Sequence, residues 1–309
     1  MTTWRSRLKE HLLLVSLLFA GSERRLRTLY DAFSHNYFTE NSHFLNLGYW
    51  KDSPDTLDAA CEALANLVGE AAQFESSDVI LDAGCGMGDQ DLFWIQRFSP
   101  TKIIGLNIAP SQVAFARKQT AERRLEERLE FQLGSATDMT FEAQSFDKVV
   151  AVESAFHFNT RTAFFNEAFR VLRPRGRLVT ADLIAMPQAV SQKAQSPGLK
   201  RQAAKLVFRI SQKLMPTPIE NICTRAGYAR KMTEAGFVNV QVLTIREEVF
   251  QPFMRYLARR LQDPDIKQRI NPLFRCICQN IMAKRERGIG KMIMSASDYI
   301  IATGDKPAD

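Results

Sequence analysis

Short runs of apolar residues alternate with amphipathic stretches from about residue 76 onward. The strand-like runs are Asp78–Ala83, Lys102–Asn107, Arg128–Leu133, Lys148–Glu153, Arg177–Leu183, Phe237–Ile245 and Asp298–Thr303. Helical spacing predicts helices over Asp91–Phe98, Pro110–Glu127, Arg161–Leu172 and Thr224–Glu234. We expect the third of these helices to stop at Arg173–Gly176. Strands that alternate with helices are typical of a mostly parallel sheet with helices on both faces, so the pattern predicts an α/β fold.

Two insertions interrupt this alternation. Residues 185–221 contain four prolines and a basic amphipathic helix, and residues 249–295 read as helical and basic. In an open α/β sheet the ligand lies beyond the carboxyl ends of the strands. We therefore predict a core made of residues 76–184 and 222–309, with residues 185–221 as a helical lid over the site and 249–295 as a helical insertion before the last strand.

Composition narrows the function classes. The 309 residues are 45% hydrophobic and carry a net charge of +7, but no motif of a nucleic-acid binder accompanies the basic residues. The five cysteines are an odd number without zinc-site spacing, and the four histidines form no HExxH pattern. We predict reduced thiols, no metal site, no nucleic-acid partner and a cytoplasmic protein.

An apolar run, Leu12–Ala20, follows Arg5, Arg7 and Lys9. It is too short to span a bilayer, which takes about 20 apolar residues. The run predicts a helix that packs against a second copy of the chain, the lid or a membrane surface. The sequence leaves homo-oligomerisation and peripheral membrane contact open.

The strongest chemical signal is the sequence Leu81-Asp82-Ala83-Gly84-Cys85-Gly86-Met87-Gly88, directly after the first strand. Glycines at this spacing turn the chain sharply and bring bare backbone against a nucleotide-like ligand. The spacing is GxGxG and not the GxGxxG of dinucleotide binders, which disfavours an NAD-dependent oxidoreductase. The stretch resembles motif I of the class I S-adenosylmethionine-dependent methyltransferases. That resemblance implies that Gly84, Gly86 and Gly88 cradle the methionine part of S-adenosylmethionine, and that Asp82 orients the loop and the amino group.

Two further loops resemble cofactor-binding loops of the same family. Many members have an acidic residue where this chain has Asn107, and the departure resembles the subgroup of cyclopropane-fatty-acid synthases and tocopherol methyltransferases. The resemblance implies that Asn107, followed by Ile108, binds the ribose together with Gln112. The loop Ser135-Ala136-Thr137 resembles the adenine loop, with Asp138 as an alternative to Ser135 for recognition of the base.

Candidate catalytic residues follow the fourth and fifth strands. His157 comes just after the fourth strand, where a side chain faces the ligand crevice. Asp182 ends the fifth strand, so we expect it to support His157 as general base for a hydroxyl that attacks the sulfonium methyl. Glu153 is expected beside the sulfonium or as a hydrogen-bond partner of the base.

Within the class I methyltransferases the chain most resembles the erythromycin-type sugar O-methyltransferases of antibiotic pathways. The likeness includes Asn46–Trp50, Gly134–Asp138, Glu153–Ala155 and Asp298–Ala302. It implies a Rossmann-like fold with a seven-stranded sheet, and an N-terminal helical segment, residues 1–75, that covers the cofactor site. Tyr30, Tyr49 and Trp50 are then candidate cofactor contacts.

We therefore predict a methyltransferase that acts on a hydroxyl of a small molecule such as a natural product, a sugar or a lipid-like compound. Two alternatives stay open. One is a C-methyltransferase or cyclase for an isoprenoid or other lipophilic alkene, with Glu153, Phe156, Phe158 and Tyr228 stabilising a carbocation. The other is a non-catalytic cofactor-binding scaffold at a membrane or in a complex.

Overall fold

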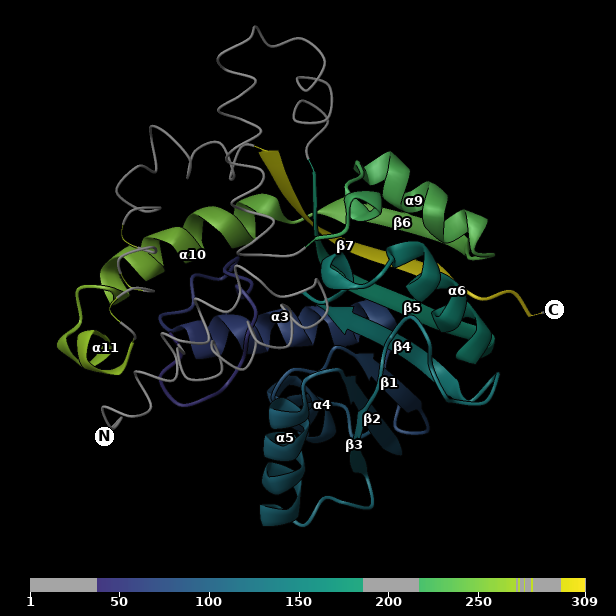
Figure 1. Ribbon diagram of the computed structural model, residues 1–309, viewed down its shortest axis with the longest axis horizontal. Coiled ribbons are helices and arrows are strands. Elements are labelled where there is room, and N and C mark those ends of the chain that lie inside the picture. The colour runs from purple at the N-terminus through teal and green to yellow at the C-terminus, as the bar shows by residue number, and fades with distance from the viewer. Residues whose placement is uncertain are drawn as a thin grey trace, which may run out of the picture.

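The computed structural model describes residues 38–185, 217–270 and 296–308, together with Pro272, Arg275 and Gln279. Its centre is a seven-stranded sheet of order β3-β2-β1-β4-β5-β7-β6 (Figure 1). The strands are β1 (Val79–Ala83), β2 (Lys102–Asn107), β3 (Leu129–Leu133), β4 (Phe146–Val152), β5 (Leu172–Ala185), β6 (Val238–Thr244) and β7 (Ser297–Asp305). β7 runs antiparallel to both β5 and β6, and the remaining neighbours pair in parallel. The predicted Rossmann-like sheet is confirmed.

The helices cover both faces of the sheet (Figure 1). They are α3 (Leu57–Ala72), α4 (Asp89–Arg97), α5 (Pro110–Glu122), α6 (Arg161–Val171), α9 (Arg225–Glu234), α10 (Arg246–Arg260) and α11 (Pro264–Arg269), with the 3-10 turns η1 (Ala155–His157) and η2 (Ile219–Asn221). Side chains of α3, α4, α5 and α10 form one apolar cluster with the sheet, and those of α6 and α9 form a second cluster. Because successive strand residues point to opposite faces, each buried strand contributes to both clusters.

Two element boundaries differ from the prediction by about five residues. The helix that begins at Pro110 ends at Glu122 and not near Glu127, and Arg124 takes a φ of +55° that no helix continues through. β5 begins directly after α6, at Leu172, because Leu172 pairs with Phe146 before the register shifts. The segment Arg173–Gly176, where we expected the helix to stop, therefore lies inside β5, next to an irregularity in its pairing with β4.

The predicted segments around the core are described only in part. Of residues 1–75, the structure describes 38–75, which contain α3; the lid prediction falls almost wholly on residues 186–216, outside the described residues. The expected helical insertion begins with α10, three residues earlier than predicted, and α10 packs on the same sheet face as α3. No helix in the described ranges is both long and apolar enough to cross a membrane.

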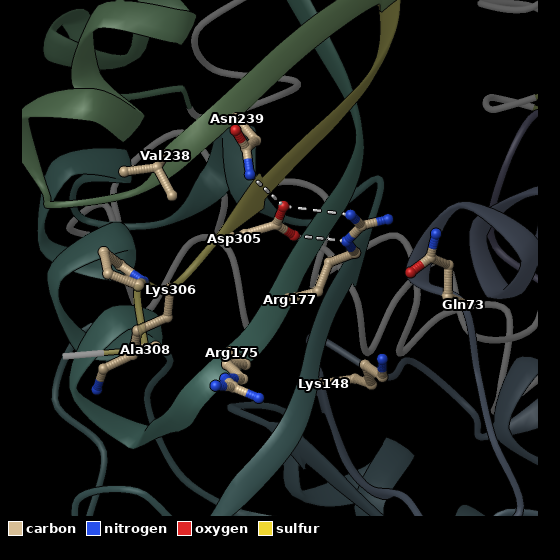
Figure 2. A pocket seen from close by; sticks show the side chains of 10 residues that line it. Gln73, Lys148, Arg175, Arg177, Val238, Asn239, Asp305, Lys306 and Ala308 are labelled. Carbon is tan, nitrogen blue, oxygen red and sulfur yellow. Dashed lines mark hydrogen bonds and ion pairs between the residues drawn. The ribbon is translucent and has the colours of Figure 1, made fainter.

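The amino ends of the parallel strands meet a basic groove of about 360 Å³ (Figure 2). Here Arg177 on β5 binds Asp305 on β7 through Nε–Oδ1 and Nη2–Oδ2 contacts of 2.7 and 3.3 Å. Asn239 donates to the same carboxylate at 3.1 Å. The cluster joins three neighbouring strands. It therefore stabilises the end of the sheet opposite to the carboxyl ends of the parallel strands, where the candidate site lies.

Candidate active site

A cavity of about 710 Å³ lies beyond the carboxyl ends of β1, β2 and β4, where an open α/β sheet binds its ligand. Its wall is formed by His43–Asn46, Gly84–Met87, Asp89, Gln90, Leu106–Ile108, Gln112, Gly134–Asp138, Val152–Ser154, His157–Asn159 and Thr217–Ile219. The predicted loops after the first, second and third strands thus meet on one cavity. The predicted residue His157 lies on the same wall.

The three glycines of the first loop have different roles. A Cβ on Gly84 would lie 2.4 Å from Cβ of Ser154, and one on Gly88 would lie 2.5 Å from the Phe131 ring, so both positions are filled by neighbouring protein. A Cβ on Gly86, where φ is +58°, would meet only Leu45, at 3.4 Å. The backbone at Gly86 is therefore the part of the loop that a ligand can approach closely.

We expect Gly86→Ala to weaken binding of S-adenosylhomocysteine, the methyltransferase product, by about tenfold or more, since the new methyl group would occupy the ligand's side of the loop. Isothermal titration calorimetry measures the change. Gly227→Ala is the control, because Gly227 lies on α9, away from the cavity wall, with no positive φ. Equal affinity of Gly86→Ala and the parent protein would contradict the role of this glycine.

Asn107 and Gln112 form a connected pair on the cavity wall. The Asn107 amide donates to Oε1 of Gln112 at 2.7 Å and to the Gly86 carbonyl at 3.2 Å. Nε2 of Gln112 is buried and has no hydrogen-bond partner among the described residues. A buried donor without a partner costs free energy unless a ligand accepts from it, and a ribose hydroxyl oxygen is a suitable acceptor. The pair thus fits the ribose of a nucleoside cofactor.

The loop after β3 is held by its own hydrogen bonds. The Oγ of Ser135 accepts from the backbone of Thr137 at 3.2 Å and lies 3.0 Å from its hydroxyl. Ala136 is buried between them and lines the cavity with them. Because the side-chain hydroxyls are engaged with each other, backbone groups of this loop are the ones suited to reading the edge of a base.

Glu153 stands at the end of β4 with a φ of +46° and lines the cavity. Its Oε1 accepts from the backbone N–H of Leu47 at 2.7 Å and from the hydroxyl of Tyr299 at 2.8 Å. Burial raises the pKa of the carboxyl to about 7 despite these two donors. Glu153 therefore changes charge near neutral pH, and its bond to Leu47 ties the segment before α3 to the cavity.

The raised pKa of Glu153 makes stability depend on pH. The folded state binds this proton more tightly than the unfolded state, whose pKa is near 4.5, so the carboxyl's contribution to the free energy of unfolding falls as pH rises from about 4.5 to about 7. Glu153→Gln keeps an acceptor for Leu47 and Tyr299 but removes the ionisation. We expect its melting temperature, relative to the parent protein, to be higher at about pH 8 than at about pH 5. A pH-independent difference would contradict this.

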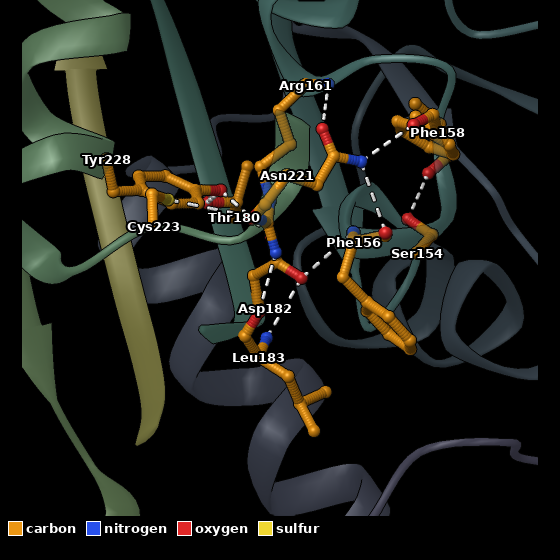
Figure 3. Close-up of polar contacts among 11 residues, drawn as sticks. Ser154, Phe156, Phe158, Arg161, Thr180, Asp182, Leu183, Asn221, Cys223 and Tyr228 are labelled. Carbon is orange, nitrogen blue, oxygen red and sulfur yellow. Dashed lines mark hydrogen bonds and ion pairs between the residues drawn. The ribbon is translucent and has the colours of Figure 1, made fainter. Parts of the chain in front are cut away.

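The structure corrects the expected pairing of Asp182 with His157. Asp182 is fully buried, and its Oδ2 accepts from Nε of Arg161 at 2.8 Å and from the Tyr228 hydroxyl at 3.1 Å (Figure 3). Its Oδ1 accepts from the backbone of Phe156 and Leu183. Its hydrogen bonds within the described residues go to these four groups, so Asp182 anchors the loop that carries the histidine.

His157 lies in η1, 8% exposed, with its backbone N–H donating to the Ser154 carbonyl at 3.0 Å. The amide of Asn221 donates to the carbonyls of Phe156 and Phe158, the residues on either side of the histidine, at 3.2 and 2.7 Å (Figure 3). Asn221 in turn accepts from the backbone N–H of Arg161 at 2.7 Å. These bonds fix the position of His157 at the cavity, and sequence reasoning missed both Asn221 and Arg161.

The N-terminal aromatic candidates do not line the cavity. Trp50 is buried against Tyr256 of α10, with its indole N–H donating to Leu47, and Tyr49 packs against the sheet-face core. The correction has a physical cause, because the backbone N–H of Tyr49 donates to Ala60 and that of Trp50 donates to Glu248, which holds both residues in the apolar clusters beside α3 and α10. Tyr30 lies outside the described residues. The residues of this segment that do reach the cavity are His43–Asn46, which the sequence did not single out.

The described residues around the cavity are predicted from the sequence to hold no metal ion. Within the described ranges, no group of three or more histidine, cysteine or carboxylate side chains could hold a metal ion. Cys61, Cys85 and Cys223 are free thiols. The site consists of a glycine loop, an amide pair and two titratable side chains, Glu153 and His157, around one cavity.

Comparison with known proteins agrees with this geometry. Residues 81–180 match the family described as "Methyltransferase domain". The chain is 36% identical over 285 residues to erythromycin 3''-O-methyltransferase of Saccharopolyspora erythraea, covering 92% of this chain and 90% of that protein. It belongs to the class I S-adenosylmethionine-dependent methyltransferases, and S-adenosylmethionine is its cofactor. Within that class it is close to the antibiotic sugar O-methyltransferases.

More distant relatives extend the comparison. The 27-O-demethylrifamycin SV methyltransferase of Amycolatopsis mediterranei is 29% identical over 185 residues, 59% of this chain and 66% of that protein. Among solved structures, the [4+2]-cyclase SpnF has a TM-score of 0.69 at 21% identity, covering 94% of this chain and 98% of that chain. The cyclopropane synthase MmaA2 from Mycobacterium tuberculosis has a TM-score of 0.70 at 16% identity, over 93% and 99%. At these identities the structural matches show the shared fold.

Proposed function

We propose that this enzyme transfers the methyl group of S-adenosylmethionine to a hydroxyl of a small natural-product molecule, such as a sugar attached to a larger scaffold. The observation that carries the proposal is that His157 shares one cavity with the glycine loop. The 36% identical relative is named for methylation of an oxygen of erythromycin, which supports an oxygen as the methylated atom here.

In this proposal the loops after β1, β2 and β3 bind the cofactor. Gly86 accepts the methionine part against bare backbone, Gln112 donates its spare N–H to a ribose hydroxyl oxygen, and the backbone from Ser135 to Thr137 reads the adenine. The fit rests on the open side of Gly86 and on the buried, unpartnered Nε2 of Gln112. When bound, the cofactor supplies an electrophilic methyl group.

The chain's own residues then supply orientation and proton removal. Nε2 or Nδ1 of His157 accepts the proton of the acceptor hydroxyl, because an imidazole titrates near neutral pH and can take a proton without prior ionisation. Asn221 and Arg161 act as positioning residues by holding the turn on which His157 sits. Glu153 places a carboxyl on the same wall, where its negative charge favours a cationic ligand centre.

The test is a transfer assay with S-adenosylmethionine labelled in the methyl group and a panel of hydroxylated acceptors, including macrolides that carry deoxysugars. Label that enters an acceptor as an acid-stable methyl ether supports the proposal. Label found only on carbon would overturn oxygen methylation while leaving the cofactor assignment intact.

A carbon-directed reaction has one supporting observation, because Phe158 and Glu153 both line the cavity and could face a carbocation. The other aromatic candidates weaken it. Tyr228 is fully buried, and its hydroxyl is bonded to Thr180 and Asp182. Phe156 is buried and lies off the cavity wall. The oxygen-directed reaction is therefore the better supported of the two.

We further propose that the enzyme works in the cytoplasm, and the free thiols of Cys61, Cys85 and Cys223 support this. Association with a second copy or with a membrane surface is a separate proposal that rests on the apolar run Leu12–Ala20. Size-exclusion chromatography with light scattering, and co-sedimentation with lipid vesicles, test the two forms of association separately.

A further inference from the structure

Two buried carboxyl groups lie behind the glycine loop. Asp82 is the last residue but one of β1 and Asp91 lies in the first turn of α4, and both side chains are fully buried. The two carboxyl groups are close enough to share a hydrogen bond when one of them is protonated. Three of their four oxygens accept no hydrogen bond from an N–H or hydroxyl group of the described residues: Oδ1 of Asp82 and both oxygens of Asp91. A hydrogen bond between two carboxyl groups requires a proton on one of them, so the pair holds one proton and one negative charge.

Within the described residues, the neighbours that interact electrostatically with the pair are other acidic groups. The titratable groups that bear on it are Cys85 in the glycine loop and Asp89 at the start of α4. Asp89 in turn accepts a hydrogen bond from the backbone N–H of His43 at 2.9 Å, and its Oδ1 lies 3.7 Å from Nδ1 of the same histidine. Burial raises the pKa of both carboxyls, and the neighbouring negative charge of Asp82 raises that of Asp91 further. Asp91 is therefore the carboxyl that keeps its proton to the higher pH, and Asp82 is the first of the two to ionise.

The ionised carboxylate is in contact with a cavity residue. Nε2 of Gln90 donates to Oδ2 of Asp82 at 2.5 Å, while Gln90 itself lines the cavity. An ionised carboxylate can only accept hydrogen bonds, so it holds the amide with its nitrogen inward. The other polar atom of the amide, the carbonyl oxygen, is left for the cavity.

We propose that Gln90 is a cofactor-binding residue whose carbonyl oxygen accepts from the α-ammonium group of S-adenosylmethionine, and that Asp82 and Asp91 are positioning residues that fix the direction of its amide. This inference rests on the proposed cofactor site. It gives Asp82 a role through Gln90, because Asp82 is buried behind that residue and does not line the cavity. It also gives a role to Asp91, whose carboxyl group is neutral while it holds the proton that the pair shares.

The direction of the Gln90 amide decides whether its interaction with the α-ammonium group is favourable or unfavourable. If Asp82 took up a second proton, its O–H could donate to the glutamine carbonyl, and the amide would turn its N–H groups toward the cavity. Two donors would then face the ammonium group, which can only donate. Binding of the amino group should therefore weaken as pH falls and Asp82 becomes protonated.

The first experiment compares two ligands by calorimetry, S-adenosylhomocysteine and its analogue without the α-amino group. Gln90→Met is expected to weaken binding of S-adenosylhomocysteine by about tenfold or more and to leave the deaminated analogue within about twofold. Gln112→Met is the matched control, since loss of a ribose contact should weaken both ligands alike. Equal effects of Gln90→Met on the two ligands, or none, would overturn the inference.

The second experiment tests the two aspartates. In Asp91→Asn the new amide donates to Asp82 in place of the shared proton, so affinity for S-adenosylhomocysteine should stay within about twofold of the parent protein at neutral pH. Asp91→Leu offers no donor, and its affinity should be lower and should fall more steeply as pH decreases. Glu153, whose pKa is raised by burial, also lies on the cavity wall, but it is the same in all variants, so the difference between profiles isolates the pair. Identical profiles for both variants would contradict the positioning role.

A third measurement separates this inference from the proposed cofactor site. The pair's raised pKa predicts that the free energy of unfolding falls as pH rises, and Asp91→Asn should reduce that fall. Thermal unfolding without ligand detects it. If the parent protein does not bind S-adenosylhomocysteine, the cofactor site is wrong whatever the unfolding shows. If it binds but Gln90→Met does not distinguish the two ligands, only the role of Gln90 is wrong.

Discussion

Replacing His157 with glutamine is expected to lower kcat for methyl transfer to a hydroxyl acceptor by roughly 100- to 10,000-fold, the usual contribution of a general base. Glutamine keeps a polar side chain of similar reach, but its amide cannot accept a proton at neutral pH. The acceptor hydroxyl then has to lose its proton to water while it attacks the methyl group. Single-turnover transfer with labelled S-adenosylmethionine measures the rate of the chemical step directly.

The same variant should bind the cofactor normally. His157 follows β4 and the Asn107–Gln112 pair follows β2, and β1 lies between these two strands. The turn of His157 is held by Asn221 through backbone carbonyls and not through the imidazole. We therefore expect the affinity for S-adenosylhomocysteine to change by less than about threefold. An unchanged kcat would remove His157 from the mechanism and favour a carbon-directed or proximity-driven reaction.

Arg161→Met is expected to lower the free energy of unfolding by about 3–5 kcal/mol, the cost of removing one partner from a buried ion pair. Arg161 and Asp182 are at most 1% exposed, and their Nε–Oδ2 distance is 2.8 Å. The guanidinium also donates to the carbonyls of Asn221 and Leu183. Its loss would leave a buried carboxylate with only the Tyr228 hydroxyl and backbone N–H groups as donors. Urea denaturation followed by circular dichroism gives the change.

Arg230→Met provides the comparison for this effect. Arg230 forms an i,i+4 pair with Glu234 on the exposed side of α9, at 3.7 Å and with both side chains more than half exposed. Such pairs contribute about 0–1 kcal/mol, so this variant should unfold within about 0.5 kcal/mol of the parent protein. Similar losses in both variants would show that the buried network contributes no more than a surface pair.

The sequence predicts the central strands well because their residues are buried on both faces. Lys102–Asn107 forms β2 with the predicted bounds, because a short, mostly apolar run between two loops is typical of a parallel strand that is buried on both faces. The start of β5 could not be predicted in the same way. Arg173, Pro174 and Arg175 are poor strand formers, and the strand begins there only because Leu172 finds a partner, Phe146, distant in sequence.

The same distinction separates the predicted and the missed site residues. Asn107 and Gln112 could be named because they follow a strand at a fixed spacing, and the structure brings them to one cavity wall. Asp182 could be placed at the end of its strand, but its partner Arg161 starts the preceding helix, and no spacing rule links the two. Asn221 is the last residue of the predicted lid, in a segment without periodicity, so its contact with the turn around His157 gives no signal in the sequence.

The position of β7 between β5 and β6 constrains the order in which the chain folds. Among the described strands, β6 pairs with β7 alone, so residues 238–244 cannot join the sheet until residues 297–305 have been synthesised. During translation, β1–β5 can pair first and leave the β5 edge open, an exposed template for wrong pairing. β7 also brings in Tyr299, whose hydroxyl binds Glu153, so the strand that closes this edge also completes the catalytic wall.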